Sequence, residues 1–417
     1  MAFNLNNSLS YPLTRLEPSY DEAQDAATCS PSQSNLGRPV YCVLGIPIDA
    51  INLTTVVSRI EAAAAERAVL FISTPNLNFL VSSLSDPEFR ESLLDSDLCP
   101  PDGTPIIWIA RLLGLPIKER AAGADLLERL QTRDMDSRRI AVFLFGGAED
   151  VAAEAARRLN SRSGGLNCVG SMNPGFCDIS EMSHDHIIDA VNSSGADFLV
   201  VSLGAKKGQL WLQRNHSRLT IPVRSHLGAA INFQAGTIKR APRLVRAWGF
   251  EWLWRIKEER YLWRRYRNDG FVLLRLLLTR VLPLVVISRW QQLRWKHLAQ
   301  DLLFREAHDD QSIKISLHGA ASERNVSKAT LRFQEALSSS KDIVIDLSDL
   351  LQIDARFMGL LLMLRKELRS RGRKLKLSAV PRAIERLIRL NELGFLLKPA
   401  YGEDGAFRSQ RESPASS

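Results

Sequence analysis

The chain has 417 residues, a length typical of two or three domains. Its 45% hydrophobic and 24% charged residues exclude a collagen-like, a disordered and a small disulfide-stapled protein, because such a chain can bury a large core. The formal net charge of +9 suits nucleic acid, an anionic membrane surface or a ligand that carries phosphate. The five cysteines form no CxxC pair, which favours a reducing compartment over disulfide bonds or a zinc site.

The two ends of the chain, residues 1–38 and 401–417, predict disordered tails. The N-terminal stretch mixes Ser, Asn, Pro and Asp with few apolar residues. It therefore lacks the apolar core of a signal peptide, and we expect a cytoplasmic protein.

Between residues 39 and 238, short apolar runs alternate with helical patterns. The runs predict strands at 40–46, 68–74, 140–147 and 197–204, and the patterns predict helices at 53–66 and 149–160. This alternation predicts a layered, Rossmann-like α/β domain with a largely parallel sheet. In such a sheet the ligand crevice lies beyond the carboxyl ends of the strands, so the polar residues after each run are candidates for a site.

One acidic candidate stands in the turn PPDGTPI at 100–106, where Asp102 precedes an apolar helix that starts near Ile106. A carboxylate at this position can cap the helix. It can also act as a general base that takes the proton of an attacking sugar hydroxyl. The local sequence leaves both interpretations open.

Other polar candidates follow strands or open helices. Thr74 and Asn76 carry the groups needed to orient a sugar, although the same residues also form turns. Arg120 and Gly123 lie at a helix entrance, where backbone N–H groups and a guanidinium can bind phosphate. Further candidates in such positions are Asp125, Gly146, Gly147 and Lys207.

The sequence lacks the common patterns for metal and cofactor binding. It contains no HExxH, no GxGxxG and no P-loop. We therefore expect no metal and no cofactor, and a departing diphosphate would be stabilised by protein cations and backbone amides.

The stretch 239–300 is strongly basic and rich in tryptophan. Residues 239–296 hold 15 Lys and Arg against four Asp and Glu, and six of the eight tryptophans. The apolar run 271–287 is interrupted by Arg275, Arg280 and Pro283, whereas a spanning helix needs about 20 apolar residues. We predict a helix that lies in the headgroup region of a membrane. The alternative is a buried helical hairpin with a solvated basic face.

Residues 312–400 predict a second, small α/β domain. Strands are predicted for IKISLHG, KDIVIDLS and KLKLSAV, with helices at 327–338, 357–371 and 382–391. About ninety residues suffice for an independent domain.

Taken in order, several motifs resemble the WecG/TagA/CpsF glycosyltransferases, glycosyltransferase family 26, over about residues 40–270. The motifs are TPN at 74–76, DLCPPDG at 97–103, RAAGADL at 120–126, FLFGG at 143–147, NPGF at 173–176, VSLGAKKGQLW at 201–211 and GAAINFQAGTIKRAPRLVRAWGFEWLWRI at 228–256. The last string is the most specific, because it is long and unusual.

The resemblance implies an inverting, metal-independent transfer of a hexose or an N-acetylhexosamine, such as ManNAc, from a UDP-sugar. The implied acceptor is a sugar on a polyprenyl diphosphate at the cytoplasmic membrane face, in the synthesis of cell-surface polysaccharides. Asp102 matches the proposed base of the family, and Thr74 and Asn76 match its sugar pocket. Three arginines match the segment that meets the membrane and closes over the site: Arg260, Arg264 and Arg265.

The chain departs from the family pattern in two places. Relatives read G-x-P-K-Q-E where this chain has GAKKGQ at 204–209. Lys207 remains there, and we take Lys207 and Gln209 as candidate substrate-binding residues. Asn232 stands where an Asp is common. These departures concern the donor sugar more than the type of reaction.

The second domain is similar to STAS domains, the modules of anti-sigma-factor antagonists. Members that are phosphorylated carry Asp-Ser-Ser-Gly after the central strand, where this chain reads Asp-Ala-Arg-Phe at 354–357. Because both hydroxyls are missing, we predict no phosphorylation of this loop. We expect the domain to bind a partner protein or to pack on the enzyme.

Three other functions are weighed against a glycosyltransferase. A catalytically inactive scaffold, recruited through residues 312–400, would have no need of Asp102, Thr74 and Asn76 together. An oxidoreductase is disfavoured by the missing dinucleotide motif. A nucleic-acid binder would carry its aromatic residues on an open groove, whereas these tryptophans accompany an aliphatic run. Members of the family self-associate, and the sequence leaves the oligomeric state open.

Overall fold

The computed structural model describes residues 34–133, 138–147, 149–162, 164–295 and 301–398. Most of the two predicted tails lies outside these residues. The last residues of the predicted N-terminal tail are ordered, however, because Leu36 is buried in a 3₁₀ turn. Arg38 also forms a buried ion pair with Asp49 at 2.7 Å. The ordered chain therefore begins before the first strand.

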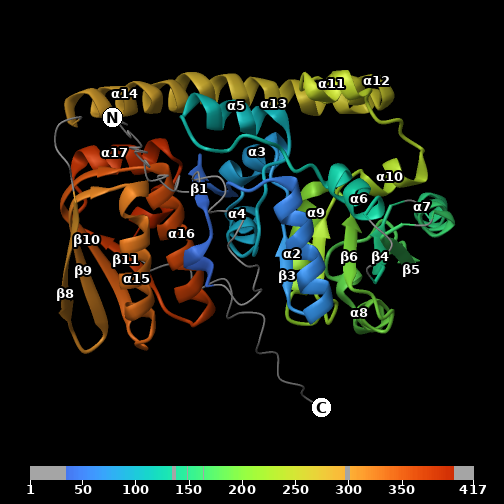
Figure 1. Cartoon of the computed structure of the whole chain (residues 1–417), viewed down its shortest axis with the longest axis horizontal. Helices are drawn as coiled ribbons and strands as arrows, with labels where there is room; N and C mark the ends of the chain where they lie inside the picture. The colour runs from blue at the N-terminus through green and yellow to red at the C-terminus, as the bar shows by residue number, and fades with distance from the viewer. Residues whose placement is uncertain (1–33, 134–137, 148, 163, 296–300, 399–417) are drawn as a thin grey trace, which may run out of the picture. The chain divides into compact units, whose positions relative to one another are not determined.

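The first domain is built on five parallel strands in the order β3-β7-β6-β4-β5 (Figure 1). Their bounds are β3 Leu70–Ile72, β4 Ile140–Gly146, β5 Leu166–Met172, β6 Phe198–Ser202 and β7 Val223–His226. The first four residues of β6 are buried, as expected for a strand covered on both faces. The predicted layered α/β class is confirmed.

Helices cover both faces of this sheet. One apolar cluster joins the sheet to α2, α6, α7 and α10, and a second joins it to α8 and α9. The bounds are α2 Leu53–Glu66, α6 Gly123–Gln131, α7 Glu149–Ser161, α8 Asp185–Asn192, α9 Ala205–Arg214 and α10 Ala230–Ala235. Asn52 begins α2 by accepting a hydrogen bond from the Thr55 amide at 2.8 Å. Helices α2 and α7 stand where the sequence predicts them.

The strand predicted at 40–46 is instead an antiparallel hairpin outside the main sheet. Its strands are β1 Val40–Val43 and β2 Ile46–Asp49. Leu44 and Gly45 have positive φ angles of 47° and 88°, so the chain reverses between the two strands. The apolar run correctly marks burial, because both strands are buried throughout.

Three further helices follow β3, and a basic helical segment follows α10. The first set is α3 Leu77–Ser85, α4 Pro87–Leu94 and α5 Thr104–Leu112; the second is α11 Arg243–Ala247, α12 Glu251–Glu258, α13 Trp263–Leu276, a π-helical turn Leu277–Val281 and α14 Leu282–Trp295. The last three run on as one helix, so the alternative of a helical hairpin is wrong. By length and composition, Arg260–Gln291 is able to cross a membrane.

This long helix is apolar on more than one side. Val272, Leu273 and Leu276 pack on the protein core. Another side carries exposed apolar residues at a spacing of three or four, which places them in one stripe. The stripe consists of Phe271, Leu274, Leu278, Leu282, Val286 and Trp290.

The second domain has a four-stranded sheet in the order β11-β10-β9-β8. Its elements are β8 Leu302–His308, β9 Ser312–Ala321, α15 Val326–Leu337, β10 Asp342–Ile353, α16 Ala355–Ser370, β11 Leu375–Ser378 and α17 Arg382–Leu390. Strand β8 pairs antiparallel with β9 and is missing from the sequence prediction, because only its first residue is buried.

Helix α16 packs on the first domain as well as on its own sheet. Gly359 lies so close to β1 that an added Cβ would stand 2.1 Å from the Val40 carbonyl oxygen. The Arg365 guanidinium contacts the Glu91 carboxylate at 2.6 Å, and Lys366 contacts Asp97 at 2.8 Å. The two domains therefore share one continuous apolar core.

Candidate active site

A cavity of about 690 Å³ opens at the carboxyl ends of the parallel strands. Its wall includes residues within two positions of the ends of four strands: Thr74 after β3, Gly147 after β4, Leu203 after β6 and Leu227 after β7. Helices α12 and α13 supply the other side of the wall. Both the size and the place are typical of a substrate site in an open α/β sheet.

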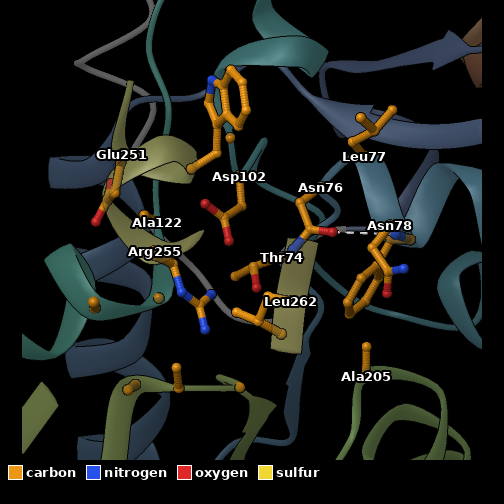
Figure 2. Close-up of a pocket in the computed structure, with 18 of the residues that line it drawn as sticks. Thr74, Asn76, Leu77, Asn78, Asp102, Ala122, Ala205, Glu251, Arg255 and Leu262 are labelled. Atoms are coloured by element: carbon orange, nitrogen blue, oxygen red, sulfur yellow. Dashed lines mark hydrogen bonds between the residues drawn. The ribbon is translucent and has the colours of Figure 1, made fainter. Parts of the chain in front are cut away.

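Asp102 stands in this wall, in the turn before α5. Its backbone N–H donates to the Pro75 carbonyl oxygen at 2.8 Å, which ties the turn to the loop after β3. The residue at the N-cap of α5 is Gly103, and no side chain caps this helix. The interpretation of Asp102 as a helix cap is therefore wrong, and its carboxyl group is available to the cavity (Figure 2).

Burial raises the pKa of Asp102 to about 7. The positive charges of Arg120 and Arg255 oppose this rise, while the carboxylates of Glu251 and Asp125 add to it. A carboxyl group with a pKa near neutrality both loses its own proton at working pH and accepts one effectively from a hydroxyl group. These are the properties of a general base.

Thr74 and Asn76 lie beside Asp102 in the loop after β3 (Figure 2). The Asn76 Oδ1 atom accepts from the Phe79 amide at 3.2 Å, so this residue caps α3. Its Nδ2 donors remain for a ligand, since Asn76 also lines the cavity. Buried Thr74 presents a hydroxyl group to the same space.

Helix α12 contributes two residues that the sequence analysis does not select. Glu251 accepts from Arg120 at 2.6 Å, which links α12 to the loop before α6. Arg255 lies one helical turn later, and its guanidinium points into the cavity near Asp102 (Figure 2). The i, i+4 spacing in GFEWLWR could have indicated that both residues share one helix face.

Two more unpredicted polar residues lie where α13 meets α3. Asn78 donates to the buried carboxyl group of Asp269 at 3.4 Å, and both line the cavity. Burial raises the pKa of Asp269. Asp269 follows the basic and polar run WRRYRN at 263–268, which is typical of an exposed helix face and does not indicate a buried carboxyl group.

No cluster of three metal-ligating side chains occurs in the part of the chain that the structure describes. Asp95 and Asp97 form an Asp-x-Asp pair outside the cavity. Their carboxylates accept from Gln213 at 2.7 Å and from Lys366 at 2.8 Å.

Comparison with known proteins decides the family. Residues 41–285 match the model of the glycosyl transferase WecG/TagA/CpsF family. The chain belongs to this family. Residues 304–398 match a second model, described as Mlab, STAS domain. Both resemblances seen in the sequence are thereby confirmed, and the chain is a glycosyltransferase.

Relatives with named activities match about half of the chain. An N-acetylglucosaminyldiphosphoundecaprenol N-acetyl-beta-D-mannosaminyltransferase of Bacillus spizizenii is 26% identical over 214 residues, which are 51% of this chain and 81% of the relative. The enzyme of the same name from Staphylococcus aureus (strain NCTC 8325) is 23% identical over 216 residues, 51% of this chain and 82% of the relative. Each match thus spans about half of this chain.

Among the other site residues that the sequence predicts, four line the cavity: Arg120, Gly123, Gly147 and Arg265. Gly123 permits the close packing of the loop before α6, since an added Cβ would lie 2.9 Å from Leu227. Gly146 does not line the cavity. Its φ of 95° instead allows the turn after β4.

Three expected residues have other partners. Asp125 binds Arg240 at 2.5 Å and Arg246 at 3.2 Å, so it anchors the segment that leads to α12. Lys207 donates to the Cys177 carbonyl oxygen, on the wall of a separate surface pocket. Gln209 is fully buried and donates to Ser73 at 2.5 Å, behind the loop that carries Thr74. The structure thus places all three outside the main cavity.

Arg260 and Arg264 also lie outside it, around a shallow surface pocket at the start of α13. The side chains of the STAS loop at 354–357 also form hydrogen bonds within the protein. Asp354 caps α16 by accepting from the Phe357 amide at 2.8 Å. Arg356 donates to the Val40 carbonyl oxygen at 3.1 Å, so the loop packs on the enzyme domain.

Proposed function

We propose that this glycosyltransferase moves a hexose or an N-acetylhexosamine from a UDP-sugar to a sugar carried on a polyprenyl diphosphate. The supporting relatives are named for transfer of N-acetyl-beta-D-mannosamine to N-acetylglucosaminyldiphosphoundecaprenol. The single observation that carries the proposal is the Asp102 carboxyl group, with its pKa raised to about 7, in the wall of the cavity.

The proposed chemistry is a direct displacement with inversion. Asp102 takes the proton of the acceptor hydroxyl, whose oxygen forms a new bond to the anomeric carbon of the donor. The bond from that carbon to the diphosphate breaks at the same time, and UDP leaves with the electron pair. Thr74 and Asn76 orient a sugar for this attack.

The departing diphosphate requires positive charge, and we assign this role to Arg255 and Arg265. Both line the cavity, and an arginine fork can bind phosphate oxygens in pairs. The proposal therefore includes no metal ion. A transferase assay with EDTA tests this part, and a loss of activity that Mg²⁺ restores would contradict it.

We further propose that the enzyme works on the cytoplasmic face of a membrane. The exposed stripe of Phe271, Leu274, Leu278, Leu282, Val286 and Trp290 supports this location. Additional exposed aromatic residues on the same basic segment are Trp248, Trp252, Tyr261 and Trp263. Apolar and aromatic side chains among arginines are typical of a helix in the headgroup region.

The direct test is UDP release by purified protein, with a panel of UDP-sugars and a lipid-diphosphate GlcNAc acceptor. Asp102→Asn should lower kcat about 100-fold or more, the usual contribution of a general base. Its melting temperature should not fall, since no capping bond is lost. Wild-type protein without transfer to any acceptor would favour the inactive scaffold, and full activity of Asp102→Asn would remove this residue from the base role.

A further inference from the structure

A second, apolar groove continues from the catalytic cavity. It measures about 410 Å³ and is lined by Pro105, Trp108, Ile109, Arg111, Leu112, Leu273 and Leu277. Pro105, Trp108 and Leu273 also line the catalytic cavity. The two hollows therefore meet at these three side chains.

The groove follows from the packing of α5 against the long basic helix. Positions 105, 108, 109 and 112 fall on one face of α5, which begins two residues after Asp102. This face runs about 10 Å away from the catalytic turn, at 1.5 Å per residue. Leu273 on α13 and Leu277 in the π-helical turn form the opposite wall.

The chemistry of the groove suits a hydrocarbon chain. Six of its seven lining residues are apolar, and the guanidinium of the seventh, Arg111, donates to the Lys118 carbonyl oxygen at 3.4 Å. Trp108 and Leu112 are 43% and 50% exposed, so large apolar surface faces solvent here. Surface of this kind at the mouth of a ligand cavity marks a binding site.

We propose that this groove binds the first isoprene units of the acceptor lipid. The inference rests on the proposed function, which places the acceptor's sugar and diphosphate in the main cavity. A tail that leaves this cavity beside Trp108 meets α5 and Leu273, and then Leu112 and Leu277. The exposed stripe of the same helix begins nearby at Phe271 and Leu274, so the tail reaches the bilayer along apolar surface.

The test compares acceptors that share one sugar diphosphate head and differ only in the tail. One acceptor has no tail, one has a short prenyl tail and one has a longer prenyl tail. All three are chosen to remain monomeric in solution, so that no vesicles are needed. For the wild-type enzyme we expect kcat/KM to rise with tail length through a lower KM, because each buried methylene adds to binding. A value independent of the tail would overturn the proposal.

Leu112→Asp places a charge in the groove and should remove about tenfold of kcat/KM for the longest tail. It should leave the tail-free acceptor unchanged. The matched control is Leu303→Asp, the same change at a similarly exposed leucine of β8 that belongs neither to the groove nor to the exposed stripe. Equal loss in both variants, or no loss in Leu112→Asp, would contradict the groove.

A second measurement does not depend on turnover. An acceptor with a photoreactive group at the end of a short prenyl tail should crosslink to peptides that contain 105–112 or 273–277, and Leu112→Asp should reduce this labelling. Labelling elsewhere would overturn the groove assignment. Failure of the proposed function has a different outcome, since no acceptor would then be glycosylated, with or without a tail.

Discussion

Asp102 carries the chemistry because opposing influences set its pKa. Burial alone pushes the pKa upward, and the nearby guanidinium groups of Arg120 and Arg255 hold it near neutrality. Two of the charges that act on Asp102, Arg120 and Glu251, pair with each other at 2.6 Å. The loop before α6 and helix α12 therefore tune a carboxyl group that belongs to neither.

The pH profile of transfer should reflect this pKa. Asp102 acts as a base only when ionised, so kcat/KM should rise with pH, reach half its maximum at about pH 7 and then level off. Initial rates between pH 5 and pH 9 measure the profile. A value of kcat/KM that stays constant down to pH 5 would show that the pKa of Asp102 is not near 7, or that Asp102 is not the base.

Changes at the neighbouring charges should move this midpoint in opposite directions. Glu251→Gln removes a negative charge and should lower the midpoint, whereas Arg120→Gln removes a positive charge and should raise it. Both variants break the same ion pair, so each controls for the other. A shift of both midpoints in one direction would indicate a general loss of geometry.

The raised pKa also has a cost in stability. Between about pH 4 and pH 7 the folded protein keeps a proton on Asp102 that the unfolded chain has lost, so stability falls with rising pH. Asp102→Asn removes this dependence. Its melting temperature relative to wild type should therefore be higher at pH 8 than at pH 5, and an equal difference at both values would contradict the raised pKa.

At this scale the sequence predicts residues whose backbone motif fixes their position. Thr74 and Asn76 lie in the loop after β3 and Asp102 in the segment before α5, and the structure brings them to one cavity. Glu251 and Arg255 depend on how α12 folds back over the sheet, which no local pattern determines. Gln209 lies in α9, the helix after β6, and is therefore a candidate for substrate binding in the sequence. Its side chain instead points into the protein and donates to Ser73.

Among the elements, the long basic helix lines the cavity with some residues and exposes apolar side chains with others. Asp269 and Leu273 form part of the catalytic wall, while Leu274 and Leu278 face outward. One helix thus contacts both the substrate cavity and the surroundings of the protein. Movement of this helix on binding to a membrane surface would therefore shift Asp269 and Leu273 in the cavity wall.

We predict that the double variant Leu274→Asp and Val286→Asp loses most binding to anionic vesicles in a sedimentation assay, because two charges enter the exposed stripe. Activity on a tail-free acceptor should remain. Leu303→Asp, at an exposed leucine of β8, is the matched control and should bind vesicles like wild type. Unchanged sedimentation of the double variant would contradict membrane docking through this stripe.

Element prediction succeeds where burial and period agree. Strands β4 and β6 are almost fully buried and read as apolar runs. Strand β7 reads Val-Arg-Ser-His yet is also buried, because Arg224 donates to the His216 carbonyl oxygen and Ser225 to that of Ile72. A buried strand that is made of polar residues has no apolar run by which the sequence could predict it.

At the scale of the whole molecule, the STAS domain is held by the enzyme through α16. Asn35 and Arg38 precede β1 and contact Glu367 and Met363 of this helix at 2.7 and 3.3 Å. On its other side, Phe357 packs against Phe333 of α15. The sequence predicts both domains, but it contains no signal for this shared interface, because residues buried in it look like ordinary core.

Gly359→Ala tests the interface. The new Cβ would stand 2.1 Å from the Val40 carbonyl oxygen, so we expect a loss of about 1–3 kcal/mol in the free energy of unfolding. Gly37→Ala is the control, because nothing lies within 4 Å of its added Cβ. Urea unfolding measures the stability of both variants. If Gly359→Ala were as stable as wild type, the close contact between α16 and β1 would not be required for stability.

The burial of α16 on two sides bears on how such a module can be exchanged between proteins. A STAS domain fused to another glycosyltransferase would expose the apolar face of α16 to solvent unless the hairpin β1–β2 were transferred with it. Conversely, an enzyme half expressed by itself would expose the seat of that helix. Separate expression of either domain is therefore expected to leave apolar surface of the shared core uncovered.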